Sequence, residues 1–149
     1  MHKVYITGIA GFIGFHLAEK LAMDGYEVEG VDNFNDYYDP QLKHDRANIL
    51  KDKFGIKIVD YDIEIIPWAH YLEGYDAVIH LAAHAGVRHS LENPQMYIDT
   101  NITATQRLIH ACEHYEIPVI YASSSTADSD HLNPYAWSKY VNEKQFETS

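Results

Sequence analysis

Three glycines at every third position, Gly8, Gly11 and Gly14, constrain the fold of this chain more than any other feature. They follow Lys3–Thr7, a run typical of a strand, and they open Phe12–Met23, which has the periodicity of a helix. In such a turn the first glycine permits a tight bend, the second lets a ligand approach the backbone, and the third allows close packing of helix and strand. Free N–H groups at the helix start attract an anion. The turn predicts a pyrophosphate site, with a plain glycine-rich turn as the alternative.

Short strand-like runs alternate with helical segments along all 149 residues. The predicted strands are Lys3–Thr7, Glu27–Asp32, Ile56–Asp60, Ala77–Leu81 and Val119–Ser123. The predicted helices are Phe12–Met23, Gln41–Lys51, Pro94–Tyr115 and one that begins at Pro134, with a short irregular turn near Ile65–Leu72. Gly25 is expected to end the first helix in a left-handed conformation, and Asn133-Pro134 to begin the last. We predict an α/β fold, one Rossmann-type doubly wound domain over residues 1–149, with about five parallel strands in three layers.

Asp32 ends the second predicted strand, 18 residues after Gly14. This is near the spacing of roughly 20 residues between the glycine turn and the ribose-binding acid of dinucleotide sites. A carboxylate there accepts hydrogen bonds from ribose hydroxyls and repels a 2′-phosphate, and no Arg or Lys lies between Asp32 and Lys43 to bind one. The two signals together predict NAD rather than NADP as cofactor, with a solvated acid at a strand end as the alternative.

The charge of the chain limits its classes of partner. It has 11 Lys and Arg against 22 Asp and Glu, a net charge of −11, which argues against nucleic acid and anionic membranes. No apolar run is long enough to span a membrane, and Met1 leads into a strand without a signal-peptide pattern, so we expect a soluble cytoplasmic protein. The single cysteine, Cys112, excludes an internal disulfide. His110 and His114 have a zinc-like spacing, but no third ligand is evident and we predict no metal.

Tyr135 and Lys139 lie four positions apart on the last predicted helix, so their side chains share a face. An ammonium close to a phenol favours the phenolate, which suits the pair to general acid–base catalysis. Ser123, Ser124 and Ser125 end the fifth predicted strand, at the sheet edge where open α/β folds bind ligands. A tyrosine and a lysine at this spacing also occur on ordinary amphipathic helices, so the pair alone leaves its role open.

Taken together and in this order, these features resemble the extended short-chain dehydrogenase/reductase family, an NAD-dependent epimerase/dehydratase family, and specifically its UDP-glucuronate 4-epimerase-like branch. The resemblance covers nearly the whole chain. The stretches that carry it are Thr7–Leu17, Val31–Asp39, His80–Pro94, Tyr97–Ile102, Tyr121–Ser125 and Tyr135–Glu143. Related sugar dehydratases place Thr-Asp-Glu where this chain has Ser124-Ser125-Thr126, which favours epimerase over dehydratase chemistry.

The resemblance implies an NAD site and a nucleotide-sugar substrate of the UDP-glucuronate or UDP-hexose class. The cofactor-binding residues that it implies are Gly8, Gly11, Phe12, Ile13, Gly14, Asp32, Asn33, Asp62, Ile63, Leu81, Ala82, Ala83, Tyr135 and Lys139. Ser124, Tyr135 and Lys139 match catalytic positions, and Asn101 matches a helix-kinking asparagine behind the site. Such enzymes oxidise C4 of the sugar transiently and reduce it again on the other face, which returns the cofactor to its starting state.

Two differences from the family affect this expectation. Ser124 and Tyr135 are 11 positions apart, closer than is usual in the family, because the connection through Ser129 and Asp130 is short. Because the sequence ends at Ser149, we expect it to lack the family's small substrate domain, which the resemblance implies supplies most substrate contacts. The alternatives are an epimerase-type enzyme and a non-catalytic NAD-binding module. We also expect a homodimer through the helices at Pro94–Tyr115 and Pro134–Glu147, because the last strand becomes an exposed edge.

Overall fold

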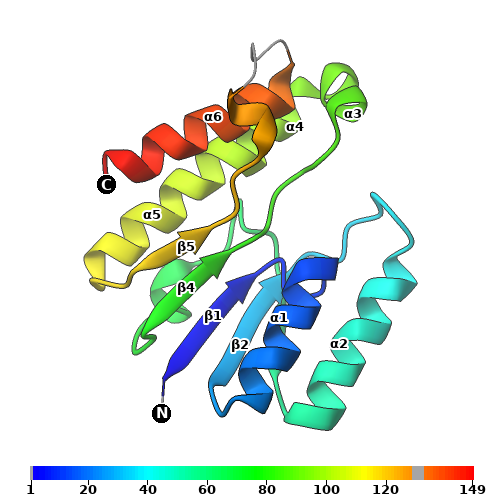
Figure 1. Cartoon of the computed structure of the whole chain (residues 1–149), viewed down its shortest axis with the longest axis vertical. Coiled ribbons are helices and arrows are strands. Elements are labelled where there is room, and N and C mark those ends of the chain that lie inside the picture. The colour runs from blue at the N-terminus through cyan, green and yellow to red at the C-terminus, as the bar shows by residue number, and fades with distance from the viewer. Residues whose placement is uncertain (1, 129–132) are drawn as a thin grey trace.

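The computed structural model describes residues 2–128 and 133–149, which form an α/β domain around a five-stranded parallel sheet (Figure 1). The strands are β1 (Lys3–Thr7), β2 (Glu27–Asp32), β3 (Lys57–Asp60), β4 (Ala77–His80) and β5 (Val119–Tyr121). Their order across the sheet is β3-β2-β1-β4-β5, so the winding reverses between β1 and β4. This order and the parallel pairing of all neighbours confirm the predicted Rossmann-type fold.

Local capping chemistry sets several helix boundaries. The helices are α1 (Phe12–Met23), α2 (Pro40–Phe54), α3 (Val87–Glu92), α4 (Pro94–Tyr97), α5 (Thr105–His114) and α6 (Pro134–Glu147). The other helical elements are the 3-10 helices η1 (Trp68–His70) and η3 (Ser125–Asp128) and the π-helix η2 (Ile98–Ala104). The Asp39 carboxylate accepts from the Gln41 amide, and the Asn133 side chain accepts from the Ala136 amide, so both α2 and α6 begin at a cap followed by proline. Gly25 follows α1 with φ of 89°, as predicted.

The sheet separates two apolar cores because successive residues of a strand point to opposite faces. Ile6 of β1 packs with Ala18 of α1 and Leu50 of α2. Its neighbour Tyr5 packs in a second cluster that includes Leu108 of α5. Helices α1 and α2 therefore cover one face, while α5 covers the other with α6 beside it, which gives the predicted three layers (Figure 1).

The long helix predicted at about Pro94–Tyr115 is helical from Pro94 to His114, as α4, η2 and α5 in direct succession. The structure interrupts it with η2, a π-helical segment around Asn101. Such segments persist where side chains replace the regular backbone hydrogen bonds. Here the Asn142 amide of α6 donates to the Asn101 carbonyl at 2.6 Å. A tertiary contact that helix periodicity does not encode therefore decides the shape of this helix.

Smaller corrections concern the ends of elements. Residues Val87–Glu92, for which the sequence predicts no regular element, form α3. Strand β5 ends at Tyr121 rather than Ser123, because the serines leave the sheet toward η3. Helix α2 extends to Phe54, where Gly55 ends it in a left-handed conformation with φ of 68°.

Candidate functional site

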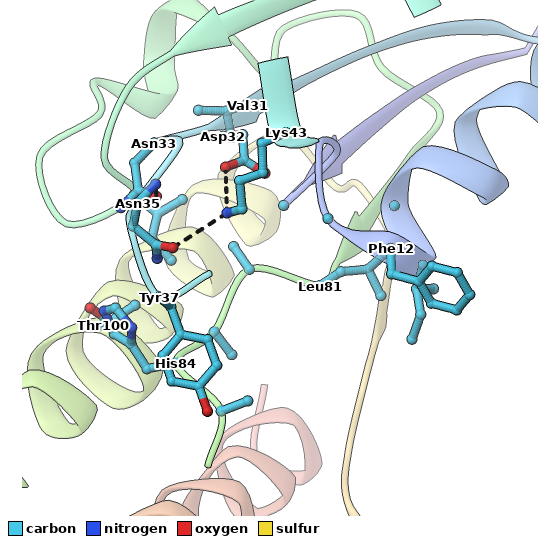
Figure 2. Close-up of a pocket in the computed structure, with 18 of the residues that line it drawn as sticks. Phe12, Val31, Asp32, Asn33, Asn35, Tyr37, Lys43, Leu81, His84 and Thr100 are labelled. Atoms are coloured by element: carbon cyan, nitrogen blue, oxygen red, sulfur yellow. Dashed lines mark hydrogen bonds and ion pairs between the residues drawn. The ribbon is translucent and has the colours of Figure 1, made fainter. Parts of the chain in front are cut away.

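A cavity of about 360 Å³ lies at the carboxyl ends of β1, β2 and β4, the edge at which a doubly wound sheet binds ligands (Figure 2). Most of the predicted cofactor-binding residues line it, namely Gly8, Gly11, Phe12, Ile13, Gly14, Asp32, Asn33, Ile63, Leu81, Ala82 and Ala83. Asp62, Ser124, Tyr135 and Lys139 are not among the described residues that do so. The fold thus brings together segments that lie more than 70 positions apart in the sequence.

The glycine turn packs too closely against its surroundings to carry side chains. Gly8 has φ of 72°, and a Cβ on it would lie 2.9 Å from the Ala82 amide nitrogen. A Cβ on Gly14 would lie 2.3 Å from the Gly8 carbonyl oxygen. For Gly11 the nearest atom would be that same oxygen, at 3.2 Å, so the space beside Gly11 is otherwise open to the cavity. The turn therefore leaves a cradle that a Cβ would fill.

A buried chain of hydrogen bonds holds the loop after β4, which forms one wall of the cavity. Thr7 Oγ1 accepts from the amides of Leu81 and Ala82, both at 3.1 Å. With both lone pairs used, its hydroxyl donates to His80 Nδ1 at 2.7 Å. The opposite nitrogen, His80 Nε2, then carries the proton and donates to Thr105 Oγ1 at 2.9 Å. Burial lowers the pKa of His80 to about 3, so this ring stays neutral near neutral pH.

Asp32 is buried at the end of β2 and its carboxylate already has several partners. Oδ2 accepts from the Ala10 amide at 3.0 Å, and Oδ1 accepts from the Phe34 amide at 2.9 Å. Lys43, on the first turns of α2, turns back toward the sheet and places Nζ 3.1 Å from Oδ1 (Figure 2). The side chains of Asp32 and Lys43 are 3% and 9% exposed, and both residues line the cavity. The acid predicted to bind ribose is thus one half of a buried ion pair.

The two neighbouring residues predicted to contact adenine, Asp62 and Ile63, differ in their position relative to the cavity. Ile63 lines the cavity, whereas Asp62 lies outside its lining. The Asp62 carboxylate accepts from Asn33 Nδ2 at 3.2 Å and from the Glu64 amide at 2.9 Å. Its contacts therefore orient Asn33, which does line the cavity.

Helix α6 carries Tyr135 and Lys139 to the same end of the sheet. Lys139 is buried, and its ammonium donates to the Ala122 carbonyl at 3.0 Å, next to the cavity that Ala122 lines. Burial lowers the pKa of Lys139 to about 8. The Tyr135 ring meets the Tyr97 ring edge-on, with 6.3 Å between centroids. Lysine and tyrosine therefore occupy successive turns of the helix that faces this end of the site.

Ser124 lies after β5, and its hydroxyl is 2.9 Å from the Thr126 hydroxyl. The neighbouring Ser123 donates to Glu143 of α6, which ties this segment to the helix. Ser129 and Asp130, on the short connection to Tyr135, lie outside the described residues. The structure thus places the predicted serine at the carboxyl end of β5, as its position in the sequence indicates.

Asn101 joins these elements from within η2. Its Oδ1 accepts from the His84 amide at 2.8 Å, and its Nδ2 donates to the His84 carbonyl and to Ser138 Oγ, both at 3.0 Å. Ser138 in turn donates to the Tyr135 carbonyl at 2.8 Å. One buried amide therefore connects the cavity wall at His84 with the helical turn that carries Tyr135.

The match to known proteins extends over nearly the whole domain. A model of the NAD dependent epimerase/dehydratase family matches residues 4–148. The chain belongs to this family. Protein CapI of Staphylococcus aureus is 43% identical over 160 residues, which cover 95% of this chain and 47% of that protein. UDP-glucuronate 4-epimerase 3 of Arabidopsis thaliana is 39% identical over 136 residues, covering 83% of this chain and 30% of that protein.

Solved structures of epimerases have the same fold. The UDP-glucuronic acid 4-epimerase of Bacillus cereus, in complex with UDP-glucuronic acid and NAD, matches with a TM-score of 0.90 and 32% identity, over 98% of this chain and 51% of that one. The UDP-glucose 4-epimerase of Bifidobacterium longum, in complex with NAD+ and UDP, matches with a TM-score of 0.80 and 27% identity, over 98% of this chain and 48% of that one. This epimerase/dehydratase-family chain thus spans about half the length, or less, of the relatives it matches.

The cavity of this family member also contains residues that sequence reasoning did not predict: Val31, Asn35, Tyr37, Tyr38, Lys43, Tyr61, His84, Ala85, Thr100 and Ala122. Tyr37 crosses from the loop after β2 to the loop after β4, where a Cβ on Gly86 would lie 2.4 Å from its hydroxyl oxygen. Asn35 and His84 follow strand ends closely, a signal that could have identified them. No such signal marks Lys43, because its place in the site depends on how α2 packs.

Within residues 2–128 and 133–149, no group of three or more His, Cys, Asp or Glu side chains could hold a metal ion. His110 Nδ1 lies 3.8 Å from a Glu113 carboxylate oxygen on the exposed side of α5. In the same part of the chain, no helix combines the length and apolarity needed to cross a bilayer.

Replacing Asn101 with alanine is expected to lower the free energy of unfolding by about 3 kcal/mol, because three hydrogen bonds are lost at a site that water does not reach. Urea denaturation measures the change. Asn93→Ala is the control, since the exposed Asn93 amide makes only a long contact of 3.4 Å and its loss is worth less than about 0.5 kcal/mol. Equal stabilities of the two variants would show that the Asn101 bonds do not hold the site together.

Replacing Lys139 with methionine is expected to stabilise this family member by about 2 kcal/mol near pH 7. Burial lowers the Lys139 pKa from 10.5 to about 8, so the folded chain binds this proton less tightly than the unfolded chain. The resulting destabilisation is fully present below pH 8 and fades as the pH rises from 8 to 10.5. Loss of the hydrogen bond to Ala122 offsets part of the gain.

Urea denaturation near pH 7 and again near pH 10.5 measures this gain and its disappearance. Lys144→Met is the matched control on the same helix, because Lys144 is exposed and pairs with Glu147 at 2.9 Å. It is expected to give no stabilisation at either pH. A Lys139→Met variant less stable than the parent near pH 7 would contradict an energetic cost of burying this ammonium.

Proposed function

We propose that this chain is an NAD-dependent nucleotide-sugar 4-epimerase-type domain that acts on the UDP-glucuronate or UDP-hexose class. One observation carries the proposal: the buried ammonium of Lys139 donates to Ala122, which lines the same cavity as the glycine turn and Asp32. This contact supports a role for Lys139 beside the proposed dinucleotide cavity. Relatives named as UDP-glucuronate 4-epimerases support the substrate class.

The residues present fit an adenine dinucleotide. The turn at Gly8, Gly11 and Gly14 leaves the cradle described above, and the start of α1 supplies amides for a pyrophosphate. Asp32 and Asn33 would hold the adenosine ribose. The other residues proposed to bind NAD are Phe12, Ile13, Asp62, Ile63, Leu81, Ala82, Ala83, Tyr135 and Lys139, with Asp62 acting through Asn33. When bound, NAD supplies the acceptor and donor of hydride.

Three residues of this chain are proposed to handle the proton. Tyr135 takes the proton of the sugar 4-hydroxyl while a hydride leaves C4, and returns it when the turned keto sugar is reduced on its other face. Ser124 donates a hydrogen bond to the oxygen on C4. Lys139 stabilises negative charge on the phenol and holds the nicotinamide ribose. No reductant is consumed, because the reaction is a net inversion.

The second candidate is a non-catalytic NAD-binding module. The chain matches 47% of CapI and 51% of the Bacillus cereus epimerase, so the turnover of those proteins is to be tested here separately from cofactor binding. Remote contacts position a substrate for reaction, so binding of the cofactor and turnover of a substrate are separable properties. The predicted homodimer through α5 and α6 stays a prediction for both candidates.

The test is incubation of the purified chain with UDP-glucuronate and NAD, followed by proton NMR for UDP-galacturonate. Conversion supports the epimerase. NAD binding in calorimetry without conversion supports the module. A chain that binds no NAD contradicts both candidates.

A further inference from the structure

We propose that Lys43 is a second ligand of the adenosine ribose and that it sets, together with Asp32, the choice between NAD and NADP. The inference rests on the proposed function, in that the cavity takes an adenine dinucleotide. It concerns a residue that neither the glycine turn nor the strand ends identify. Three features of the structure carry it: the location of Lys43, the lone pairs left on Asp32, and the sum of the two charges.

The location of Lys43 is that of a ligand rather than of a surface lysine. Its side chain is 9% exposed, although lysines are among the residues least often buried. Nζ lies 3.1 Å from Asp32 Oδ1 and 3.5 Å from Asn35 Oδ1, and it faces the Tyr38 ring with 5.4 Å to the centroid. Lys43, Asp32 and Asn35 all line the cavity (Figure 2). The ammonium is therefore held at the cavity wall, at the end predicted to bind ribose.

The free lone pairs of the Asp32 carboxylate are too few to accept a hydrogen bond from both hydroxyls of a ribose. Oδ1 already accepts from the Phe34 amide and from Lys43, and Oδ2 accepts from the Ala10 amide. A carboxylate oxygen accepts about two hydrogen bonds, so only Oδ2 has an acceptor site left. A ribose offers two neighbouring hydroxyls. One can donate to Oδ2, and the other needs a different partner.

Lys43 can supply that partner. An ammonium has three N–H donors, of which one is directed to Asp32 and one to Asn35. The third is available to the oxygen of the second hydroxyl. The ion pair and the ribose would then form one hydrogen-bond network, in which one hydroxyl binds Asp32 and the other binds Lys43. A hydrogen bond from a charged donor is stronger than a neutral one, so its loss lowers affinity by about 10-fold or more.

The charges of Asp32 and Lys43 together decide whether the site attracts or repels the 2′-phosphate of NADP. A lone carboxylate repels it, and this repulsion is the basis on which Asp32 predicts NAD. In the structure the Lys43 charge lies against the Asp32 charge, so the two nearly cancel toward a ligand in the cavity. Removing Lys43 exposes the carboxylate and should reject NADP more strongly. Removing the Asp32 charge exposes the ammonium and should do the opposite.

The experiment measures dissociation constants of NAD and NADP by calorimetry for the full chain and four variants. Lys43→Met is expected to lower the affinity for NAD by about 10-fold and the affinity for NADP by about 100-fold. The preference for NAD over NADP then rises about 10-fold. Asp32→Asn is expected to lower that preference by about 10-fold or more. Lys43→Arg keeps a cationic donor and should preserve the parent's preference within about threefold. The double variant Asp32→Asn with Lys43→Met removes both charges and should lie between the single variants.

An analogue of NAD that lacks one adenosine ribose hydroxyl provides a readout that a structural role would not change. The 2′-deoxy and 3′-deoxy forms are both tested. One of them is expected to bind the parent about 10-fold more weakly than NAD, and this difference should vanish in Lys43→Met. Circular dichroism shows whether each variant folds, and Lys43→Arg and the double variant remain informative if the unpaired Asp32 unfolds Lys43→Met.

Two outcomes overturn the inference. If Lys43→Met weakens NAD and NADP equally, Lys43 only holds Asp32 in place. If both deoxy analogues lose as much affinity in Lys43→Met as in the parent, Lys43 does not contact the ribose. A parent chain that binds neither dinucleotide would be a different result, because it contradicts the proposed function itself.

Discussion

An alanine at Gly14 is expected to abolish NAD binding and to lower the free energy of unfolding by about 3 kcal/mol. Its Cβ would lie 2.3 Å from the Gly8 carbonyl oxygen and 2.8 Å from the Cα of Ile9. Both are backbone atoms, which cannot turn aside as a flexible side chain can, so α1 must move away from β1. Replacing a helical glycine gains about 1 kcal/mol of helix propensity, which is smaller than this cost.

Gly11→Ala is the matched control from the same turn. Gly11 has φ of −71°, open to any residue, and its Cβ would have one close neighbour at 3.2 Å. The variant is expected to stay within about 1 kcal/mol of the parent in urea denaturation, while its methyl group enters the cavity and weakens NAD by about 10-fold or more. If Gly14→Ala instead folds as stably as the parent and binds NAD equally well, close packing of helix and strand does not shape this site.

Replacing Tyr135 with phenylalanine is expected to reduce any epimerase turnover by about 10²–10⁴-fold without releasing NAD. The variant loses only the hydroxyl that is proposed to carry the proton. The edge-on contact with Tyr97, at 6.3 Å between centroids, depends on the ring and persists. Proton NMR of UDP-glucuronate conversion gives the rate, and calorimetry gives the affinity for NAD.

Tyr140→Phe is the control for this prediction, because Tyr140 lies on the same helix and is 36% exposed. Its conversion rate and NAD affinity should equal those of the parent. Full activity of Tyr135→Phe would remove Tyr135 from the mechanism. A loss of NAD affinity in parallel with activity would assign Tyr135 to binding rather than to proton transfer.

The parts of the site that could be predicted have local causes. The glycine turn is recognisable because β1, the turn and α1 follow one another directly in the sequence. Each glycine is needed because a side chain there would meet nearby atoms or fill the cavity. Asp32 is recognisable because a strand end at that spacing reaches the same sheet edge. The caps at Asn133 and Asp39 likewise act on the next turn of chain.

The parts that could not be predicted depend on partners that are distant in sequence. Lys43 has a helical position that periodicity alone would leave on a surface, and only the approach of α2 to β2 buries it against Asp32. The resemblance indicates a kink at Asn101, but not the hydrogen bond that its carbonyl accepts from Asn142, which lies 41 positions away. The hydrogen bond from Asn33 to the Asp62 carboxylate likewise joins residues 29 positions apart.

By itself, the order of residues determined the doubly wound sheet, the glycine cradle and the acid that ends β2, because strand alternation, glycine sterics and strand spacing act over a few residues. Tertiary structure alone decided that this acid carries a buried lysine partner and that Asn101 connects the cavity wall to the helix of Tyr135. The physical reason is that a buried polar group must find a hydrogen-bond partner, and packing of distant elements decides which partner is within reach.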